Sequence, residues 1–172
     1  EKIFDSPEAK KDSKDRADEI SRSAAEMLAS IAPTDTIYPY RDAVDALIKT
    51  VSPEILREDF IRIPAAKALG RYGDTRAVDV LTKVLADRGD DPEKIARLRP
   101  VRWQCTKSLS MIFAQTGIAP STDVFTALVT NCVGDGDYEI ELVCAEALGN
   151  AKLTEEQRRE VAKKRRIARE SY

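Results

Sequence analysis

The sequence predicts an all-α protein, an α–α superhelix (solenoid) of about four stacked helix pairs. The first observation behind this class is an internal repeat, because residues 65–70 match residues 144–149 at an offset of 79 residues. Weaker copies at 105–110 and 24–29 give spacings of 41, 40 and 39 residues, which are typical of two antiparallel helices with their turns. The second observation is apolar spacing of helical period between these copies. No alternating apolar run lies between turn signals, so no sheet is predicted.

The first helix of each unit carries the repeated motif. A small residue lets neighbouring helices approach closely, and a leucine four positions later fills the interface. The small residues are Ala24, Ala65, Cys105 and Cys144, and the leucines are Leu28, Leu69, Leu109 and Leu148. Gly70 and Gly149 are predicted near the ends of these helices, where glycine readily adopts the left-handed cap conformation.

A second helix is predicted in each unit from apolar residues at i, i+3, i+4 and i+7. The clearest stripes are Val44-Leu47-Ile48-Val51, Val78-Leu81-Val84-Leu85 and Val124-Phe125-Leu128-Val129-Cys132. Helix starts are marked by a capping residue, a proline and an acid in that order. This pattern occurs at Ser6-Pro7-Glu8, Ser52-Pro53-Glu54 and Asp91-Pro92-Glu93.

These elements predict one domain over residues 1–172. It consists of a charged leader at 1–18 and repeats at approximately 19–51, 54–87, 92–133 and 138–170. The segment 87–97 lengthens the connection before the third repeat, and a short extra helix that projects from one edge is one conformation open to it.

One stretch resembles a known repeat family. Residues 62–81 are similar to the HEAT-like repeat associated with phycobilin lyases. The residues that carry this similarity are Arg62-Ile63-Pro64-Ala65-Ala66, Ala68-Leu69-Gly70, Gly73-Asp74, Ala77-Val78 and Leu81. That family carries an "R..AA.ALG..GD..AV..L" pattern, and a partial likeness extends over roughly residues 20–165. The resemblance implies a right-handed superhelix whose second helices line a concave, protein-binding face. It implies no chemistry by itself.

Composition and charge exclude several classes of function. The chain has 28 basic and 30 acidic residues for a net charge of −2, so nucleic acid is not an expected partner. Its longest apolar stretches fall far short of the ~20 residues needed to cross a bilayer, so no membrane span is predicted. The three cysteines include no CxxC pair, and buried thiols weakly favour a reducing compartment such as the cytoplasm. The oligomeric state stays open.

Reactive groups are scarce. The chain has no histidine, which removes the commonest general base, nucleophile partner and metal ligand. The acidic segment 134–141 is interpreted as a turn before a helix, because it lacks the spacing of a calcium loop. Basic residues at Arg97, Arg99 and Arg102 and along 158–169 are interpreted as solvated helix surface, with docking of an anionic partner as the alternative. No metal, cofactor or catalytic residue is predicted.

We therefore expect a non-catalytic protein–protein interaction scaffold, not an enzyme, and leave open whether it is a segment of a longer chain. The alternative, implied by the family resemblance, is a bilin lyase or chaperone-like accessory protein that binds a tetrapyrrole in the concave face. A protein partner is expected on a mixed-charge concave strip formed by residues opposite the apolar stripes of the second helices. These residues are Asp42, Asp45, Lys49, Arg76, Asp79, Lys83, Asp123, Thr126 and Thr130.

Overall fold

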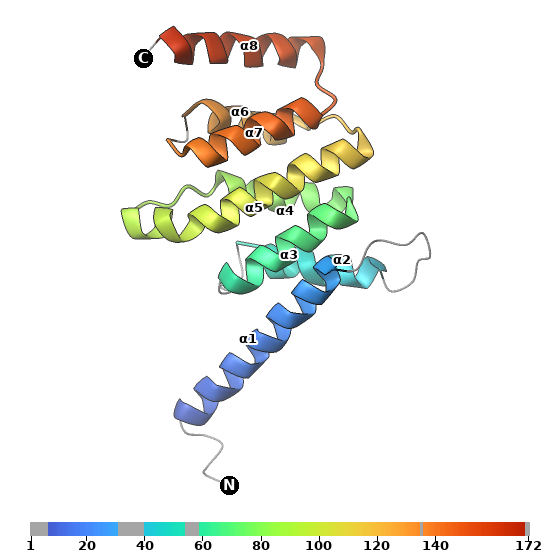
Figure 1. The fold of residues 1–172 in the computed structure, drawn as a ribbon, viewed down its shortest axis with the longest axis vertical. Coiled ribbons are helices and arrows are strands. Elements are labelled where there is room, and N and C mark those ends of the chain that lie inside the picture. The colour runs from blue at the N-terminus through green and yellow to red at the C-terminus, as the bar shows by residue number, and fades with distance from the viewer. Residues whose placement is uncertain (1–6, 31–39, 54–58, 135, 171–172) are drawn as a thin grey trace.

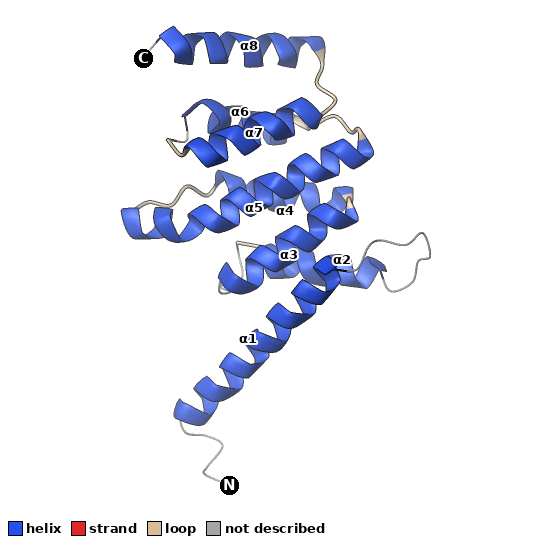
Figure 2. Cartoon of the chain, viewed as in Figure 1, coloured by secondary structure: helices blue, strands red, loops and turns tan. Residues whose placement is uncertain are grey.

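The computed structural model describes residues 7–30, 40–53, 59–134 and 136–170, which form helices joined by turns (Figure 2). In chain order the elements are α1 (Pro7–Ser30), α2 (Tyr40–Val51), α3 (Asp59–Tyr72), the 3-10 helix η2 (Thr75–Ala77), α4 (Val78–Ala86), α5 (Pro92–Thr116), α6 (Thr122–Gly134), α7 (Tyr138–Asn150) and α8 (Glu155–Glu170). None of the described ranges contains a strand, and the predicted all-α class is confirmed.

The helices stack in a linear pile of two layers, with α1 and α8 at opposite ends (Figure 1). In the first layer α1 packs on α3, α3 on α5 and α5 on α7, and in the second layer α2 packs on α4, α4 on α6 and α6 on α8. Each of α2, α4 and α6 also packs on the first-layer helix that follows it in the chain. This arrangement confirms the predicted solenoid.

One continuous apolar core runs through the stack from Ala25 in α1 to Leu148 in α7. Phe113 in α5 is the largest of its fully buried side chains. The predicted second-helix stripes face this core, since Val44, Leu81 and Leu128 are all 0% exposed. Because a repeat of this kind hides its apolar side only against its neighbours, the core is a column along the stack and not a central globule.

Small residues let the first-layer helices approach closely, as the repeat predicted. Ala65, Cys105 and Cys144 are each 0% exposed. At the α3–α5 contact a Cβ atom on Gly70 would lie 2.8 Å from the Cα atom of Ser108. The Ser108 hydroxyl donates a hydrogen bond to the Ala66 carbonyl at 2.7 Å, so the two helices are joined by a polar contact as well as by packing.

Two details of the predicted motif were wrong. In α1 the buried small residues are Ala25 (3% exposed) and Ala29 (5% exposed), whereas Ala24 is exposed, so the first copy is shifted by one residue. Gly70 and Gly149 do lie near the ends of α3 and α7, as predicted, but they are still within the helices and do not have the left-handed cap conformation. At the end of α3 the left-handed conformation is adopted instead by Gly73, which directly follows the helix and has a φ of 66°.

The lengthened connection before the third repeat does not form a separate helix. Its second half is the beginning of α5, a continuous helix of 25 residues. The Asp91 side chain caps this helix by accepting a hydrogen bond from the Lys94 backbone N–H at 2.8 Å, as its Asp-Pro-Glu start predicted. The similar start at Ser52-Pro53-Glu54 extends into residues outside the described ranges, and α3 is assigned from Asp59.

Candidate functional site

The nine predicted partner-binding residues all lie on the second layer. Asp42, Asp45 and Lys49 come from α2, Arg76 from η2, Asp79 and Lys83 from α4, and Asp123, Thr126 and Thr130 from α6. Every one of them is exposed. Since α2 packs on α4 and α4 on α6, the fold places the nine on three stacked segments of one layer. We call this set the second-helix strip; its role in binding and its curvature stay predictions.

Charges in the second-helix strip are sorted along the helices. Asp42, Asp79 and Asp123 lie in the first turns of α2, α4 and α6, whereas Lys49 and Lys83 lie in the last turns of α2 and α4. These three helices run in the same direction. The reason is that α3, α5 and α7 are parallel, and each second-layer helix leads the chain back to the start of the next first-layer helix (Figure 1). Asp42, Asp79 and Asp123 therefore lie along one edge, where they also stabilise the positive ends of the helix dipoles. Arg76 of η2, directly before α4, lies at the same edge, and Asp45 lies in the middle of α2.

Two members of the strip also hold the stack together. Arg76 forms an ion pair with Asp45 of α2 at 2.7 Å and with Asp74 at 2.8 Å. Burial acts to raise the pKa of the Asp74 carboxyl, but hydrogen bonds from the Arg76 side chain and backbone outweigh it and leave the pKa lowered. Substitution of Arg76 would therefore disturb the α2–η2 contact as well as the surface.

The basic stretch of α5 does not form one patch. Arg97 is exposed, and Arg99 pairs across to Asp137 and, at 2.9 Å, to Glu139. Arg102 is only 3% exposed and donates from Nε to the Leu85 carbonyl at 3.1 Å. These three residues consequently present no common surface to an anionic partner.

Arg102 belongs to a repeated structural contact that the sequence analysis missed. One repeat earlier, Arg62 is 6% exposed and donates from Nε and Nη2 to the Val51 carbonyl at 3.3 and 3.2 Å. Each arginine thus satisfies a carbonyl at the C-terminus of the preceding second helix, where the helix itself supplies no donor. The available signal was the spacing, because 40 residues separate Arg62 from Arg102.

Asp137 and Glu141 of the 134–141 segment have structural roles, in agreement with its interpretation as a turn before a helix. The Asp137 carboxylate caps α7 by accepting from the backbone N–H groups of Glu139 at 3.0 Å and Ile140 at 3.3 Å. The Glu141 carboxylate accepts from the Gly136 N–H at 3.2 Å. Among the described residues no group of three or more acids and cysteines is arranged to hold a metal ion.

Asp137 predicts a defined pH dependence of stability. The hydrogen bond from Arg99 holds the pKa of the Asp137 carboxyl below its usual value. Its charge therefore stabilises the fold fully above the unfolded-state pKa of about 3.9, and this stabilisation is lost as pH falls through the lower folded-state pKa. In urea unfolding, Asp137→Asn, which keeps a capping side chain, should lower the free energy of unfolding at pH 7 and match the native chain at the acid end of this window.

The control for this prediction removes the partner. In an Arg99→Gln background the pH-dependent effect of Asp137→Asn on the free energy of unfolding should largely disappear. Asp137→Ala should cost about 1 kcal/mol more than a substitution that keeps the cap, since it removes the α7 cap itself. A difference between Asp137→Asn and the native chain that persists unchanged to about pH 2, well below the unfolded-state pKa, would contradict the assigned ion pair.

The cysteines differ in environment. Cys105 and Cys144 are 0% exposed, and burial raises the pKa of the Cys105 thiol to about 12. Cys132 of α6 is partly buried; burial raises its pKa, and the nearby Arg165 partly opposes this effect. A raised thiol pKa leaves little thiolate at neutral pH, so this environment does not favour a nucleophilic role.

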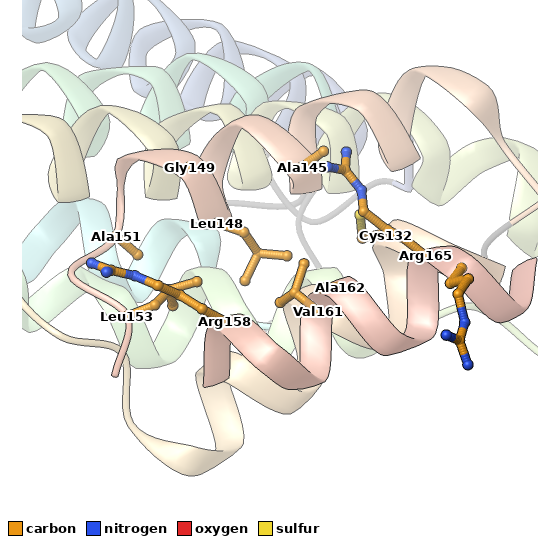
Figure 3. A pocket seen from close by; sticks show the side chains of 11 residues that line it. Cys132, Ala145, Leu148, Gly149, Ala151, Leu153, Arg158, Val161, Ala162 and Arg165 are labelled. Carbon is orange, nitrogen blue, oxygen red and sulfur yellow. The ribbon is translucent and has the colours of Figure 1, made fainter. Parts of the chain in front are cut away.

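A groove between α7 and α8 is the second candidate site, and Figure 3 shows it from close by. Its volume is about 530 Å³. Apolar side chains line its interior, and Leu148 of α7 and Val161 of α8 point toward one another across it (Figure 3). Arg158, Arg165 and Arg166 of α8 also line it. From the sequence, the basic residues of α8 were interpreted as solvated surface, with docking of an anionic partner as the alternative, and a groove was not predicted. The available signal was Leu153-Gln157-Val161, the partly buried positions at spacing i, i+4 and i+8.

Comparison with known proteins gives one positive finding. A family model described as HEAT repeats matches residues 11–99, which is about half of the chain. Searches of the curated proteins and of the solved structures each found no match. In the described part of the chain no helix is long and apolar enough to cross a membrane.

Proposed function

We propose that this chain, which belongs to the HEAT-repeat family, is a non-catalytic scaffold that binds a protein partner along the second-helix strip. HEAT repeats typically form helical stacks whose extended surfaces bind other proteins. The observation that carries the proposal is the exposure of all nine strip residues on helices that pack side by side. A surface of this length suits an elongated partner segment better than a small molecule.

The charge pattern indicates what kind of segment would fit. The strip has three acids along the edge formed by the helix starts, where the one strip cation at that edge, Arg76, is paired with Asp45 and Asp74, and Lys49 and Lys83 lie toward the helix ends. A partner with basic residues along one side and acidic residues along the other would be complementary in one orientation and repelled in the other. The charges of the strip therefore select one orientation of the partner segment and contribute more to the specificity of binding than to its affinity.

The non-catalytic part of the proposal rests on how the polar groups are used. The chain has no histidine, and two of its three cysteines are buried. Asp74, Asp137 and Arg102 are engaged in caps and contacts between helices. Catalysis generally needs a titratable group of suitable pKa in reach of a bound substrate, and this use of the acids and thiols favours binding over chemistry.

Thr126→Arg with Thr130→Arg tests the strip without disturbing the ion pairs. Both residues are exposed on α6, and a large cation at each position should obstruct a bound segment. We expect a strip-bound partner to be recovered about tenfold less in quantitative co-purification from cells, the loss that about 1.4 kcal/mol of binding free energy produces. Thermal unfolding should change little, because both positions face solvent.

The matched control is Ala96→Arg with Ala114→Arg, two exposed positions of α5 in the first layer that add the same charge. These changes should leave recovery unaltered. Equal recovery of every co-purified protein with both double variants would end the proposal for the strip. Addition of the native chain to phycocyanobilin should leave the visible absorption spectrum of the pigment unchanged, whereas a tetrapyrrole-binding accessory protein would shift this spectrum.

A further inference from the structure

The packing order of the stack gives the α7–α8 groove a specific shape. In the rest of the stack each second-layer helix packs on the first-layer helix that follows it, as α6 does on α7, and consecutive first-layer helices pack on one another. The groove lies between the first-layer helix α7 and the second-layer helix α8, and Cys132 of α6 also lines it. It therefore offers the two surfaces that a further first-layer helix would contact.

Both apolar side chains and arginines line the groove. Leu148, Leu153 and Val161 are all partly or fully buried apolar side chains, joined by Ala145 and Ala151. The Arg158 and Arg165 side chains are exposed, and Arg165 also interacts with the Cys132 thiol. Over its whole length α8 has seven basic and four acidic residues, so it carries a net charge of +3. An apolar floor beside a row of arginines is complementary to a helix with one apolar face and acidic flanks.

We propose that the groove between α7 and α8 binds an acidic amphipathic helix of a partner protein, seated as a further first-layer helix. This inference rests on the proposed function, because it assumes that the chain binds proteins. It assigns a second surface, separate from the second-helix strip, and it specifies the chemistry of the segment bound there.

The first-layer helices themselves show which residues such a helix needs. Three of the four first-layer helices, α3, α5 and α7, bury a branched apolar residue, a small residue and a leucine at spacing i, i+4 and i+8. The sets are Ile61-Ala65-Leu69 in α3, Val101-Cys105-Leu109 in α5 and Ile140-Cys144-Leu148 in α7. We expect the partner helix to carry the same apolar pattern, with acids on its sides that reach Arg158 and Arg165.

The sequence of α7 supplies a probe of this chemistry. A peptide of residues 137–150 contains the Ile-small-Leu pattern and four acids, with no basic residue. With Cys144→Ala to prevent oxidation and a fluorescein label, its binding to the full chain can be followed by fluorescence anisotropy. We expect a Kd of about 10–100 μM, because an unstructured peptide must be ordered on binding.

A pair of matched variants tests the site. Arg158→Glu with Arg165→Glu places acids at the groove edge and should weaken peptide binding at least about tenfold. Arg159→Glu with Lys163→Glu changes the net charge of the same helix equally, but neither residue lines the groove, so binding should change less than about twofold. Far-UV circular dichroism establishes that both variants keep the helical content of the native chain.

Cys132 provides an independent reporter in the native chain. It lies in the groove and is partly exposed, whereas Cys105 and Cys144 are fully buried, so a thiol reagent should label Cys132 first. Saturating peptide should slow this labelling at least about fivefold, because it covers the thiol.

A peptide that instead replaced α7 on α6 would bind equally to both double variants, and that result would overturn the proposal.

Other occupants give different outcomes. If both double variants weaken peptide binding equally, the peptide is held by general charge attraction to α8. If a single-stranded DNA displaces the peptide and binds with higher affinity, the basic edge of the groove is assigned to nucleic acid. Concentration-dependent dimers that are lost only in Arg158→Glu with Arg165→Glu would assign the groove to a second copy. Each of these results overturns the partner-helix proposal. Failure of the peptide to bind, with partner recovery still sensitive to Thr126→Arg and Thr130→Arg, removes the groove and leaves the proposed function standing.

Discussion

Replacing Arg102 with alanine is expected to lower the free energy of unfolding by about 3–5 kcal/mol. The guanidinium is buried, and it donates to the Leu85 carbonyl at 3.1 Å and to Asn131 Oδ1 at 2.7 Å. Truncation leaves both acceptors without this donor, at the junction of α4, α5 and α6. It also removes the packing of the long side chain and leaves a cavity, so the two penalties add.

Urea unfolding followed by far-UV circular dichroism measures this effect. Arg97→Ala is the control, because Arg97 is exposed on the same helix and its loss should cost less than about 0.5 kcal/mol. Arg62→Ala should resemble Arg102→Ala, since Arg62 makes the corresponding contact with Val51. A loss below about 1 kcal/mol for Arg102→Ala would show that the buried hydrogen bonds are not needed for stability.

Gly70→Ala and Gly149→Ala are expected to change stability in opposite directions, although the two glycines occupy equivalent repeat positions. At Gly70 the new methyl group would lie 2.8 Å from the Cα atom of Ser108, so α3 and α5 must separate. We expect a cost of about 1–3 kcal/mol. At Gly149 no atom lies within 4 Å of the added Cβ, and alanine should stabilise α7 by about 0.5–1 kcal/mol.

The midpoint of thermal unfolding measured side by side decides this prediction. The two substitutions are chemically identical, so any effect of alanine on the unfolded chain is common to both. Ser108→Gly should partly rescue Gly70→Ala, because it removes the Cβ and Oγ atoms that lie near the new methyl group. Equal shifts at the two positions would contradict the close approach of α3 and α5.

Much of the fold could be predicted from the sequence because the repeat is recognised by the size and the spacing of its residues. Ala65, Cys105 and Cys144 could be placed in the core since only small residues allow adjacent helices to approach closely. The error in α1 has a physical origin. Ala24 and Ala25 both satisfy the size pattern, and only the direction in which α1 meets α3 decides which of them is buried.

The surfaces were less predictable than the core. Helical phase alone placed Thr126 and Thr130 on an exposed face, because a residue opposite an apolar stripe has few other directions to point. Arg102 was misinterpreted as surface, since the carbonyl that it binds belongs to another helix and is brought near only by folding. The groove beside Val161 depends in the same way on how α8 sits relative to α7, which local spacing does not encode.

The arginine contact does not recur at every junction, and this has a consequence for cooperativity. The positions equivalent to Arg62 and Arg102 fall on Glu141 at the α6–α7 junction, where a carboxylate replaces the guanidinium. A linear array with unequal couplings opens most readily at its weakly coupled end. The α6–α7 junction lacks the arginine, but α6 and α7 still pack closely, and among the described helices α8 packs to any extent only on α6 and little on α7. We therefore expect α8 to detach and return more often than the middle helices of the stack, and a ligand that holds α8 against α7 should slow this local opening.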